Sequence, residues 1–306
     1  MPQLNLATIS YLLIATALWA GNAIAGRVLV ASGAISPITL SAVRWGLAAL
    51  LLLPLGWRVF APSSALWLNK KRFLFLGLFG VGSYNALLYI ALETSTAINV
   101  TLIGASMPIW MLLIGAVFYQ TKANVLQLVG AVVSLLGVAI VLTRGDLSTL
   151  LSMQMVLGDF FIVLATITWA LYSWMLTRPG SSTERQWPWA QFLMAQVFAG
   201  LLWTGFFDSF EIAAGHAYLD LNLWTASLIL FVAIGPSLIA YRCWDLGVNG
   251  AGPTVAAFFA NFIPLFTAIF STAILGEPPQ LFHGAAFVLI VMAIWVSSTL
   301  GRFAKT

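Results

Sequence analysis

The chain has 306 residues, of which 61% are hydrophobic and only 7% are charged, and its mean hydropathy is +0.99. Soluble proteins carry roughly 25% charged residues, so a soluble globular fold is excluded and lipid is expected to surround most of the chain. The single cysteine, Cys243, excludes a disulfide framework and a cysteine-rich metal site, and the net charge of +4 is too small and too scattered for a nucleic-acid-binding protein.

Ten continuous apolar runs are long enough to cross a bilayer, for which a helix needs about 20 residues. They cover residues 9–30, 38–57, 73–92, 97–119, 125–143, 155–177, 189–207, 223–244, 253–275 and 281–300. Continuous runs favour helices over the alternating strands of a membrane barrel. The longest connector, 208–222, leaves no room for a soluble catalytic or nucleotide-binding domain. We therefore expect an all-α polytopic membrane protein with ten transmembrane helices that is not an enzyme.

Lys and Arg are distributed unevenly between the two sides that these spans define. With a cytoplasmic N-terminus, only Arg27 and Arg144 fall outside, whereas ten basic residues fall on the cytoplasmic side. These ten are Arg58, Lys70, Lys71, Arg72, Lys122, Arg178, Arg185, Arg242, Arg302 and Lys305. Cytoplasmic loops carry the excess of Lys and Arg in membrane proteins, so we expect both termini to be cytoplasmic.

Short patterns of the first half recur in the second half. Trp19-Ala20 recurs as Trp169-Ala170, an offset of 150 residues, and Pro108 recurs as Pro264, an offset of 156 residues. Residues 1–148 and 149–306 are therefore predicted to be two five-helix repeats. Because five is an odd number, the second repeat enters the membrane from the opposite side. Such inverted repeats are common in secondary transporters, which alternate access by exchanging the conformations of the two repeats.

The order of these features resembles the drug/metabolite transporter superfamily, and within it the ten-helix exporters of the EamA type. The resemblance covers nearly the whole chain. It is carried by the Trp-Ala pairs, the two prolines, Arg44 in the second helix, Leu92-Glu93-Thr94-Ser95-Thr96-Ala97 and Ile274-Leu275-Gly276-Glu277. The first half departs from the pattern, since Gln120-Thr121 stands where the second half has Gly276-Glu277. The resemblance is strongest to exporters of amino acids and metabolites, and it implies efflux.

The candidate substrate-binding residues are aromatic or uncharged polar side chains within the predicted spans. Trp19 and Trp169 lie mid-span, away from the interfacial belt where Trp is usual, and are interpreted either as walls of a central cavity or as packing residues. An unpaired amide is costly in hydrocarbon, so the polar residues either meet a ligand or link neighbouring helices. The full set is Trp19, Asn22, Tyr84, Asn85, Tyr89, Asn99, Ser106, Trp169, Tyr172 and Asn261.

Prolines and charges within the spans complete the list of candidates. Pro108 and Pro264 each remove a backbone hydrogen bond, and they are predicted to act as hinges or as static kinks. Arg44 is interpreted as an ion-pair partner or as a contact for a substrate carboxylate, and Asp159 as a structural or a proton-carrying group. Arg242 is expected to pair with Asp245.

We therefore expect a secondary transporter that exports small amphiphilic metabolites, above all amino acids, through a cavity between the repeats. The alternative is an antiporter for drugs or toxic cations. Small multidrug relatives carry an essential Glu in their first helix, but residues 9–30 contain no acid. An intramembrane enzyme or a channel fits less well, because the spans hold no catalytic constellation and inverted halves favour alternation. The expected partners are the substrate and the lipid bilayer, and no nucleic acid, metal or cofactor is expected. We expect the protein to be a monomer in a bacterial inner membrane.

Overall fold

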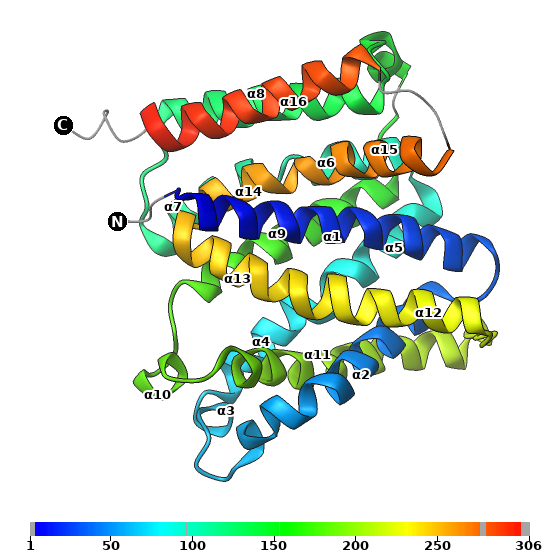
Figure 1. Cartoon of the computed structure of the whole chain (residues 1–306), viewed down its shortest axis with the longest axis vertical. Coiled ribbons are helices and arrows are strands. Elements are labelled where there is room, and N and C mark those ends of the chain that lie inside the picture. Colours follow the sequence, from blue (N-terminus) through cyan, green and yellow to red (C-terminus); the bar gives the residue numbers. More distant parts are fainter. Residues whose placement is uncertain (1–3, 96, 153, 276–279, 301–306) are drawn as a thin grey trace.

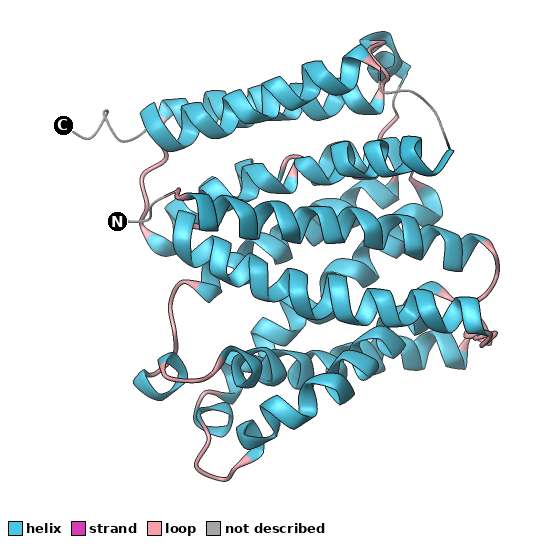
Figure 2. Ribbon diagram, viewed as in Figure 1, coloured by secondary structure: helices cyan, strands magenta, loops and turns pink. Residues whose placement is uncertain are grey.

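The computed structural model describes residues 4–95, 97–152, 154–275 and 280–300, and these residues form helices joined by short loops (Figure 2). No strand is present among them beyond one isolated bridge between Ile35 and Leu219. The helices are α1 (Leu6–Ala31), α2 (Pro37–Gly56), η1 (Trp57–Phe60), α3 (Ala65–Leu68), α4 (Lys70–Leu76), η2 (Gly77–Ser83), α5 (Tyr84–Thr94), α6 (Ala97–Gly104), α7 (Met107–Tyr119), α8 (Val125–Leu142), η3 (Leu147–Ser152), α9 (Leu157–Leu176), α10 (Ser182–Arg185), α11 (Trp189–Ala213), α12 (Leu223–Val232), η4 (Ala233–Ile239), α13 (Ala240–Ala251), α14 (Pro253–Ala260), α15 (Phe262–Leu275), α16 (Leu281–Trp295) and η5 (Val296–Leu300).

The long helices lie side by side and run back and forth across the molecule (Figure 1). The pair α8 and α16 forms one flank, and the pair α2 and α11 forms the opposite flank. Between the flanks, α1 packs against α13 and α5 packs against α9. Helix α1 begins at the same end of the bundle at which α16 ends (Figure 1).

The predicted all-α polytopic membrane fold is confirmed. Nine helical segments among the described residues are long and apolar enough to cross a membrane. The predicted run 73–92 falls in α4, η2 and α5, which follow one another from Lys70 to Thr94 and include side chains outside the described set. The predicted count of ten and the inverted relation of the two halves therefore stay predictions.

Large apolar side chains cover much of the outside of the bundle. Leu50 of α2 is 67% exposed, Leu113 of α7 is 50% exposed and Val132 of α8 is 56% exposed. A water-soluble protein rarely exposes apolar area on this scale. The exposed faces are therefore the surfaces that acyl chains cover in a bilayer.

Two helices extend further than the apolar runs predict. Helix α11 continues to Ala213 instead of residue 207, and α13 continues to Ala251 instead of residue 244. An apolar run marks the part of a helix that lies in lipid, whereas the backbone hydrogen bonds of a helix can continue into water. The polar residues Asp208 and Glu211 therefore lie on a helix, not in a loop as expected.

The two ends of the bundle differ in the charges of their connectors. At one end, called here the basic end, lie the connectors 57–69, 120–124 and 177–188. At the other, called the acidic end, lie 32–36, 143–156 and 214–222. Contacts between distant segments agree with this grouping, since Arg72 pairs with Glu184 at 2.9 Å at the basic end. At the acidic end, the Ser36 hydroxyl donates to the Glu211 carboxylate at 2.8 Å.

Candidate functional site

The two prolines that were predicted to bend helices each stand just after an interruption. Helix α6 ends at Gly104 and α7 begins at Met107, with Pro108 in its first turn. Helix α14 ends at Ala260 and α15 begins at Phe262, with Pro264 in its first turn. A first helical turn tolerates proline because its N–H groups have no partner within the helix. Each proline thus starts a second half-helix, and the hinge role stays a prediction.

Of the three π-helical segments in the described residues, η5 follows α16, whereas η2 and η4 interrupt other long helices of the bundle. They cover Gly77–Ser83 and Ala233–Ile239. Their offset of 156 residues is the same offset that relates Pro108 to Pro264, so the two segments occupy equivalent positions in the two predicted repeats. The π-helical turn is rare, and it occurs frequently at functional sites.

Glycines bring η2 close to its neighbours. A Cβ atom added to Gly77 would lie 2.5 Å from the backbone nitrogen of Gly200 in α11, and one added to Gly80 would lie 2.5 Å from the Tyr172 ring. Larger residues at these positions would push α11 and the Tyr172 ring away. The glycines therefore let a ring from the second half lie directly on the backbone of η2.

Seven aromatic side chains from both halves meet between these segments, and they are called here the aromatic cluster. Its members are Trp19, Trp45, Tyr84, Trp169, Tyr172, Tyr241 and Trp244. The Trp19 and Trp169 ring centroids are 5.1 Å apart, with the planes at 87°, and Trp19 and Trp244 are 5.2 Å apart. These are edge-to-face and tilted contacts of the kind that aromatic pairs prefer. Residues of the first half and of the second half therefore share one packed centre.

Hydrogen bonds tie the cluster to η2 and η4. Trp19 donates from Nε1 to the Pro236 carbonyl at 3.2 Å, and the Tyr241 hydroxyl donates to the Gly80 carbonyl. In addition, Trp244 donates from Nε1 to the Ser173 hydroxyl at 3.1 Å. The first of these bonds runs from a ring of the first half to a carbonyl of the second half, and the second bond runs the other way. Each half therefore supplies one ring donor and one backbone acceptor.

The candidates Trp19, Tyr84, Trp169 and Tyr172 all lie in the aromatic cluster. The Tyr84 ring centroid is 5.4 Å from that of Trp169. Asn85, the next residue along, is 6% exposed. Within the described part of the chain, no hydrogen bond is found to the Tyr84 hydroxyl or to the Asn85 amide. These polar groups therefore remain candidates for contact with substrate or water.

The other candidate residues lie elsewhere or outside the described set. The side-chain Oδ1 of Asn22 accepts from Arg44 Nη1 at 3.3 Å, so this amide helps to hold a buried cation within the membrane. Asn261 is buried and donates to the Ser134 hydroxyl at 2.7 Å, a contact that joins α8 to the break between α14 and α15. The side chains of Tyr89 and Asn99 lie outside the described set.

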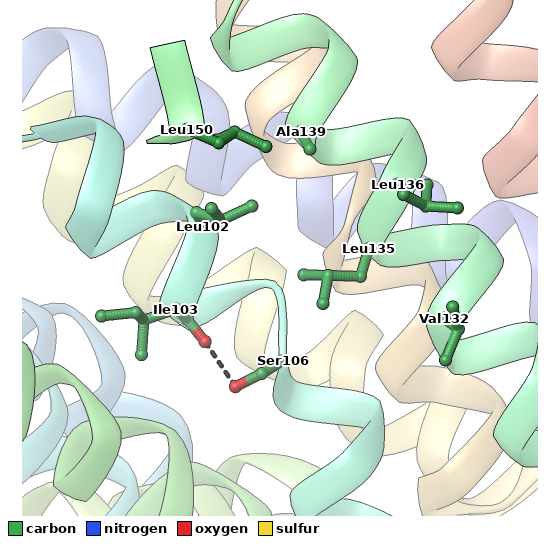
Figure 3. A pocket seen from close by; sticks show the side chains of 8 residues that line it. All are labelled: Leu102, Ile103, Ser106, Val132, Leu135, Leu136, Ala139 and Leu150. Atoms are coloured by element: carbon green, nitrogen blue, oxygen red, sulfur yellow. Dashed lines mark hydrogen bonds between the residues drawn. The ribbon is translucent and has the colours of Figure 1, made fainter. Parts of the chain in front are cut away.

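Ser106 lines a pocket of about 430 Å³ at the side of the bundle (Figure 3). Its hydroxyl donates to the Ile103 carbonyl at 2.5 Å and accepts from Trp110 Nε1 at 3.0 Å. The other lining residues are apolar: Leu102, Ile103, Val132, Leu135, Leu136, Ala139 and Leu150. Since the hydroxyl is used locally and the lining is apolar, this pocket suits an apolar group and offers no polar recognition.

Three members of the aromatic cluster were not among the predicted site residues: Trp45, Tyr241 and Trp244. The offset of 156 residues explains why the repeat did not reveal two of them. The positions equivalent to Tyr241 and Trp244 in the first half are Asn85 and Leu88, so no aromatic residue recurs there. The available signal was the spacing of Tyr241 and Trp244, which at three residues share one helix face.

The predicted charged groups have structural partners. Asp159 is fully buried, accepts from the Val156 N–H at 2.9 Å and accepts from the Ser95 hydroxyl, which holds the start of α9 against the end of α5. Arg242 pairs with Asp245 at 3.0 Å, as predicted. In the described part of the chain, no three His, Cys, Asp or Glu side chains lie close enough together to hold a metal ion.

Comparison with known proteins identifies the family. The sequence model of the EamA-like transporter family matches the chain twice, at residues 6–143 and 156–299. The chain belongs to the EamA-like transporter family. The predicted family is confirmed, and the division of the chain into two five-helix repeats, 1–148 and 149–306, stays a prediction.

The similar proteins of this family are named only as transporters. The chain is 26% identical over 280 residues to the uncharacterized transporter YyaM of Bacillus subtilis, covering 89% of this chain and 88% of the relative. It is 28% identical over 289 residues to an uncharacterized transporter of Archaeoglobus fulgidus, covering 92% and 93%. One crystal structure matches with a TM-score of 0.76 at 18% identity and covers 98% of this chain and 99% of that one. This likeness shows a shared fold. The family and the relatives together make this protein a multi-pass membrane transporter of the EamA type.

Proposed function

We propose that this EamA-type transporter exports small amphiphilic metabolites, with amino acids as its preferred substrates, by alternating access at the aromatic cluster. The observation that carries the proposal is the contact between Trp19 of the first half and Trp169 of the second half, 5.1 Å between ring centroids. A substrate held between rings from both halves contacts both of the parts that must move against each other.

The chemistry of the cluster favours an amphiphilic substrate over an ion. Aromatic rings bind apolar side chains through area and ring contacts, whereas the Tyr84 hydroxyl and the buried Asn85 amide offer uncharged hydrogen-bonding groups. A zwitterion needs such polar groups but no fixed ionic clamp. The direction of transport is inferred from the resemblance to EamA-type exporters, and a bacterial inner membrane with cytoplasmic termini follows from that resemblance and from the excess of basic residues at one end.

The experiment is uptake into proteoliposomes of a panel of amino acids and organic cations, with purified protein and with ring variants. We expect amino acids with apolar side chains to be transported, and Trp19→Ala and Trp169→Ala each to reduce the initial rate at least about five-fold, because loss of a ring contact removes on the order of 1 kcal/mol. Trp295→Ala is the matched control, since Trp295 is 56% exposed on the outside of α16. Each variant is compared at equal amounts of monodisperse protein.

Two results would contradict the proposal. Flux of organic cations without flux of any amino acid would favour the drug or toxic-cation antiporter instead. Unchanged flux in both Trp19→Ala and Trp169→Ala would show that the substrate passes elsewhere.

A further inference from the structure

The π-helical segments η2 and η4 present equivalent backbone carbonyls to the aromatic cluster. Gly80 and Pro236 are 156 residues apart and occupy the same position in η2 and η4. Both carbonyls accept side-chain hydrogen bonds, from Tyr241 and from Trp19 respectively. The centre of the protein thus contains one matched acceptor from each half.

Different residues make the two segments, but both leave the same group available. In η4, proline at position 236 has no N–H to donate to Val232, and the Ser237 hydroxyl supplies a bond of 2.9 Å to that carbonyl instead. In η2, Gly80 has no side chain, so Tyr172 packs on its backbone and the Tyr241 hydroxyl reaches its carbonyl. Both segments thus place one buried carbonyl acceptor per half against the aromatic cluster, bonded to a ring donor of the other half, which points to a use for that acceptor beyond helix geometry.

The surroundings of these carbonyls are those that recognise an ammonium group. Trp19, Trp169 and Trp244 stand within 5.1–5.8 Å of one another, ring centroid to ring centroid. Indole faces carry negative electrostatic potential and attract ammonium ions. An ammonium group has three N–H donors, and carbonyl oxygens can accept hydrogen bonds from them. The aromatic cluster itself contributes no carboxylate, and the buried charge beside it is the Arg44 guanidinium, 5.0 Å from the Trp45 ring centroid. An ammonium group in the cluster would therefore be held by rings and carbonyls and not by an ion pair.

We propose that the Gly80 and Pro236 carbonyls, framed by Trp19, Trp169 and Trp244, bind the ammonium group of the transported substrate. In the substrate-free protein, the O–H of Tyr241 and the N–H of Trp19 occupy these acceptors in place of the ammonium donors. This inference rests on the proposed function and narrows the substrate class to primary ammonium compounds with a small apolar body. Binding of such a substrate displaces both ring donors and so releases two of the contacts that join the halves.

The first test compares three ligands on the unaltered, detergent-purified protein by titration calorimetry. The ligands are leucine, isopentylamine, which lacks the carboxylate, and 4-methylpentanoate, which lacks the amine. We expect leucine and isopentylamine to bind at least about ten-fold more tightly than 4-methylpentanoate, because only they carry the ammonium donors. Equal binding of 4-methylpentanoate and isopentylamine, or no binding of any of the three, would overturn the proposal.

The second test removes the competing donor and leaves the ring. In Tyr241→Phe, the Gly80 carbonyl has no protein donor to displace, so isopentylamine should bind about five-fold more tightly, the ratio expected for one hydrogen bond, while the affinity for 4-methylpentanoate stays the same. Trp19→Phe also frees the Pro236 carbonyl but replaces an indole face with a phenyl face that attracts cations less strongly, so a smaller gain is expected there; it gives a second measurement if the first variant does not fold. Tyr218→Phe is the control, because Tyr218 lies exposed in the connector at the acidic end.

The outcomes separate this inference from the proposed function. Tighter amine binding in Tyr241→Phe without any amino-acid flux in proteoliposomes would support the ammonium site and contradict amino-acid export. Amino-acid flux with weaker or unchanged amine binding in both Tyr241→Phe and Trp19→Phe would overturn the ammonium site and leave the export function standing.

Discussion

The acidic end and the basic end of the bundle are both tied across the two halves, but by different chemistry. At the acidic end, the Glu211 carboxylate accepts from the Thr39 N–H at 2.9 Å and from the Ser36 hydroxyl at 2.8 Å. It thereby caps the start of α2, whose own N-cap residue Ser36 makes no side-chain cap bond. At the basic end, Arg72 pairs with Glu184, whose side chain is only 2% exposed.

This difference affects how easily each end can open when the two halves move against each other. When a carboxylate that caps a helix end separates from it, water replaces the lost hydrogen-bond partners, and the cost is about 1 kcal/mol, as for the loss of a helix cap. A buried ion pair is different, because separating its partners leaves a charge without compensation. If the halves move against each other during transport, the acidic end is therefore the easier one to open, and the pair at the basic end holds that end closed.

The largest expected effect concerns which end faces the cytoplasm. In a Cys243→Ser background, Ser63→Cys marks the basic end and His216→Cys marks the acidic end, and both positions are exposed. The excess of Lys and Arg places the basic end inside, so an impermeant thiol reagent should label His216→Cys in intact cells and should label Ser63→Cys only after permeabilisation. The reverse pattern would invert the orientation and the assignment of the two ends.

The next effect is on the ion pair of the basic end. Glu184→Ala leaves Arg72 without its carboxylate, and we expect a loss of stability on the order of 3 kcal/mol, measured as thermal or chemical unfolding in detergent. The control is Arg185→Ala, an exposed neighbour on α10, which should change little. A combined Arg72→Met and Glu184→Leu variant removes both charges and should regain most of the stability. Equal losses in the single and the combined variants would show that packing, not charge, holds this end.

A smaller effect is expected at the acidic end. Glu211→Ala removes the acceptor for the N–H groups at the start of α2 and should cost about 1 kcal/mol, as for the loss of a helix cap. Glu211→Gln keeps an acceptor oxygen and should retain most of that stability. Asp220→Ala, in the same region, is the matched control. A loss from Glu211→Ala as large as that from Glu184→Ala would remove the distinction between the two ends.

The positions of the helices could be predicted from the sequence more fully than the contacts between their side chains. Apolar runs located the spans because lipid requires them, and the recurrence of Trp19 at Trp169 revealed two rings that do meet. The runs could not reveal η2 and η4, since an apolar run indicates that a segment lies in lipid, not whether its turns are α-helical or π-helical. Nor could the spacing of residues reveal the pair of Arg72 and Glu184, which lie 112 residues apart and meet only through the packing of the two halves.

The smallest expected effect is at Asp159, the buried acid near the acidic end. Asn has the same shape as Asp: its oxygen can accept from the Val156 N–H, and its amide can donate to the Ser95 hydroxyl, so each of these two contacts has a replacement. We therefore expect Asp159→Asn to keep a sizeable share of transport, and transport not to require a proton gradient.

The measurement is substrate flux in proteoliposomes, first without and then with an imposed pH gradient. A proton-coupled carrier needs a titratable group that meets both sides of the membrane in turn, whereas Asp159 is held at the start of α9. Uphill accumulation that is driven by the pH gradient and lost in Asp159→Asn would make Asp159 the coupling site, and would mean that the acidic end carries protons as well as closing the bundle.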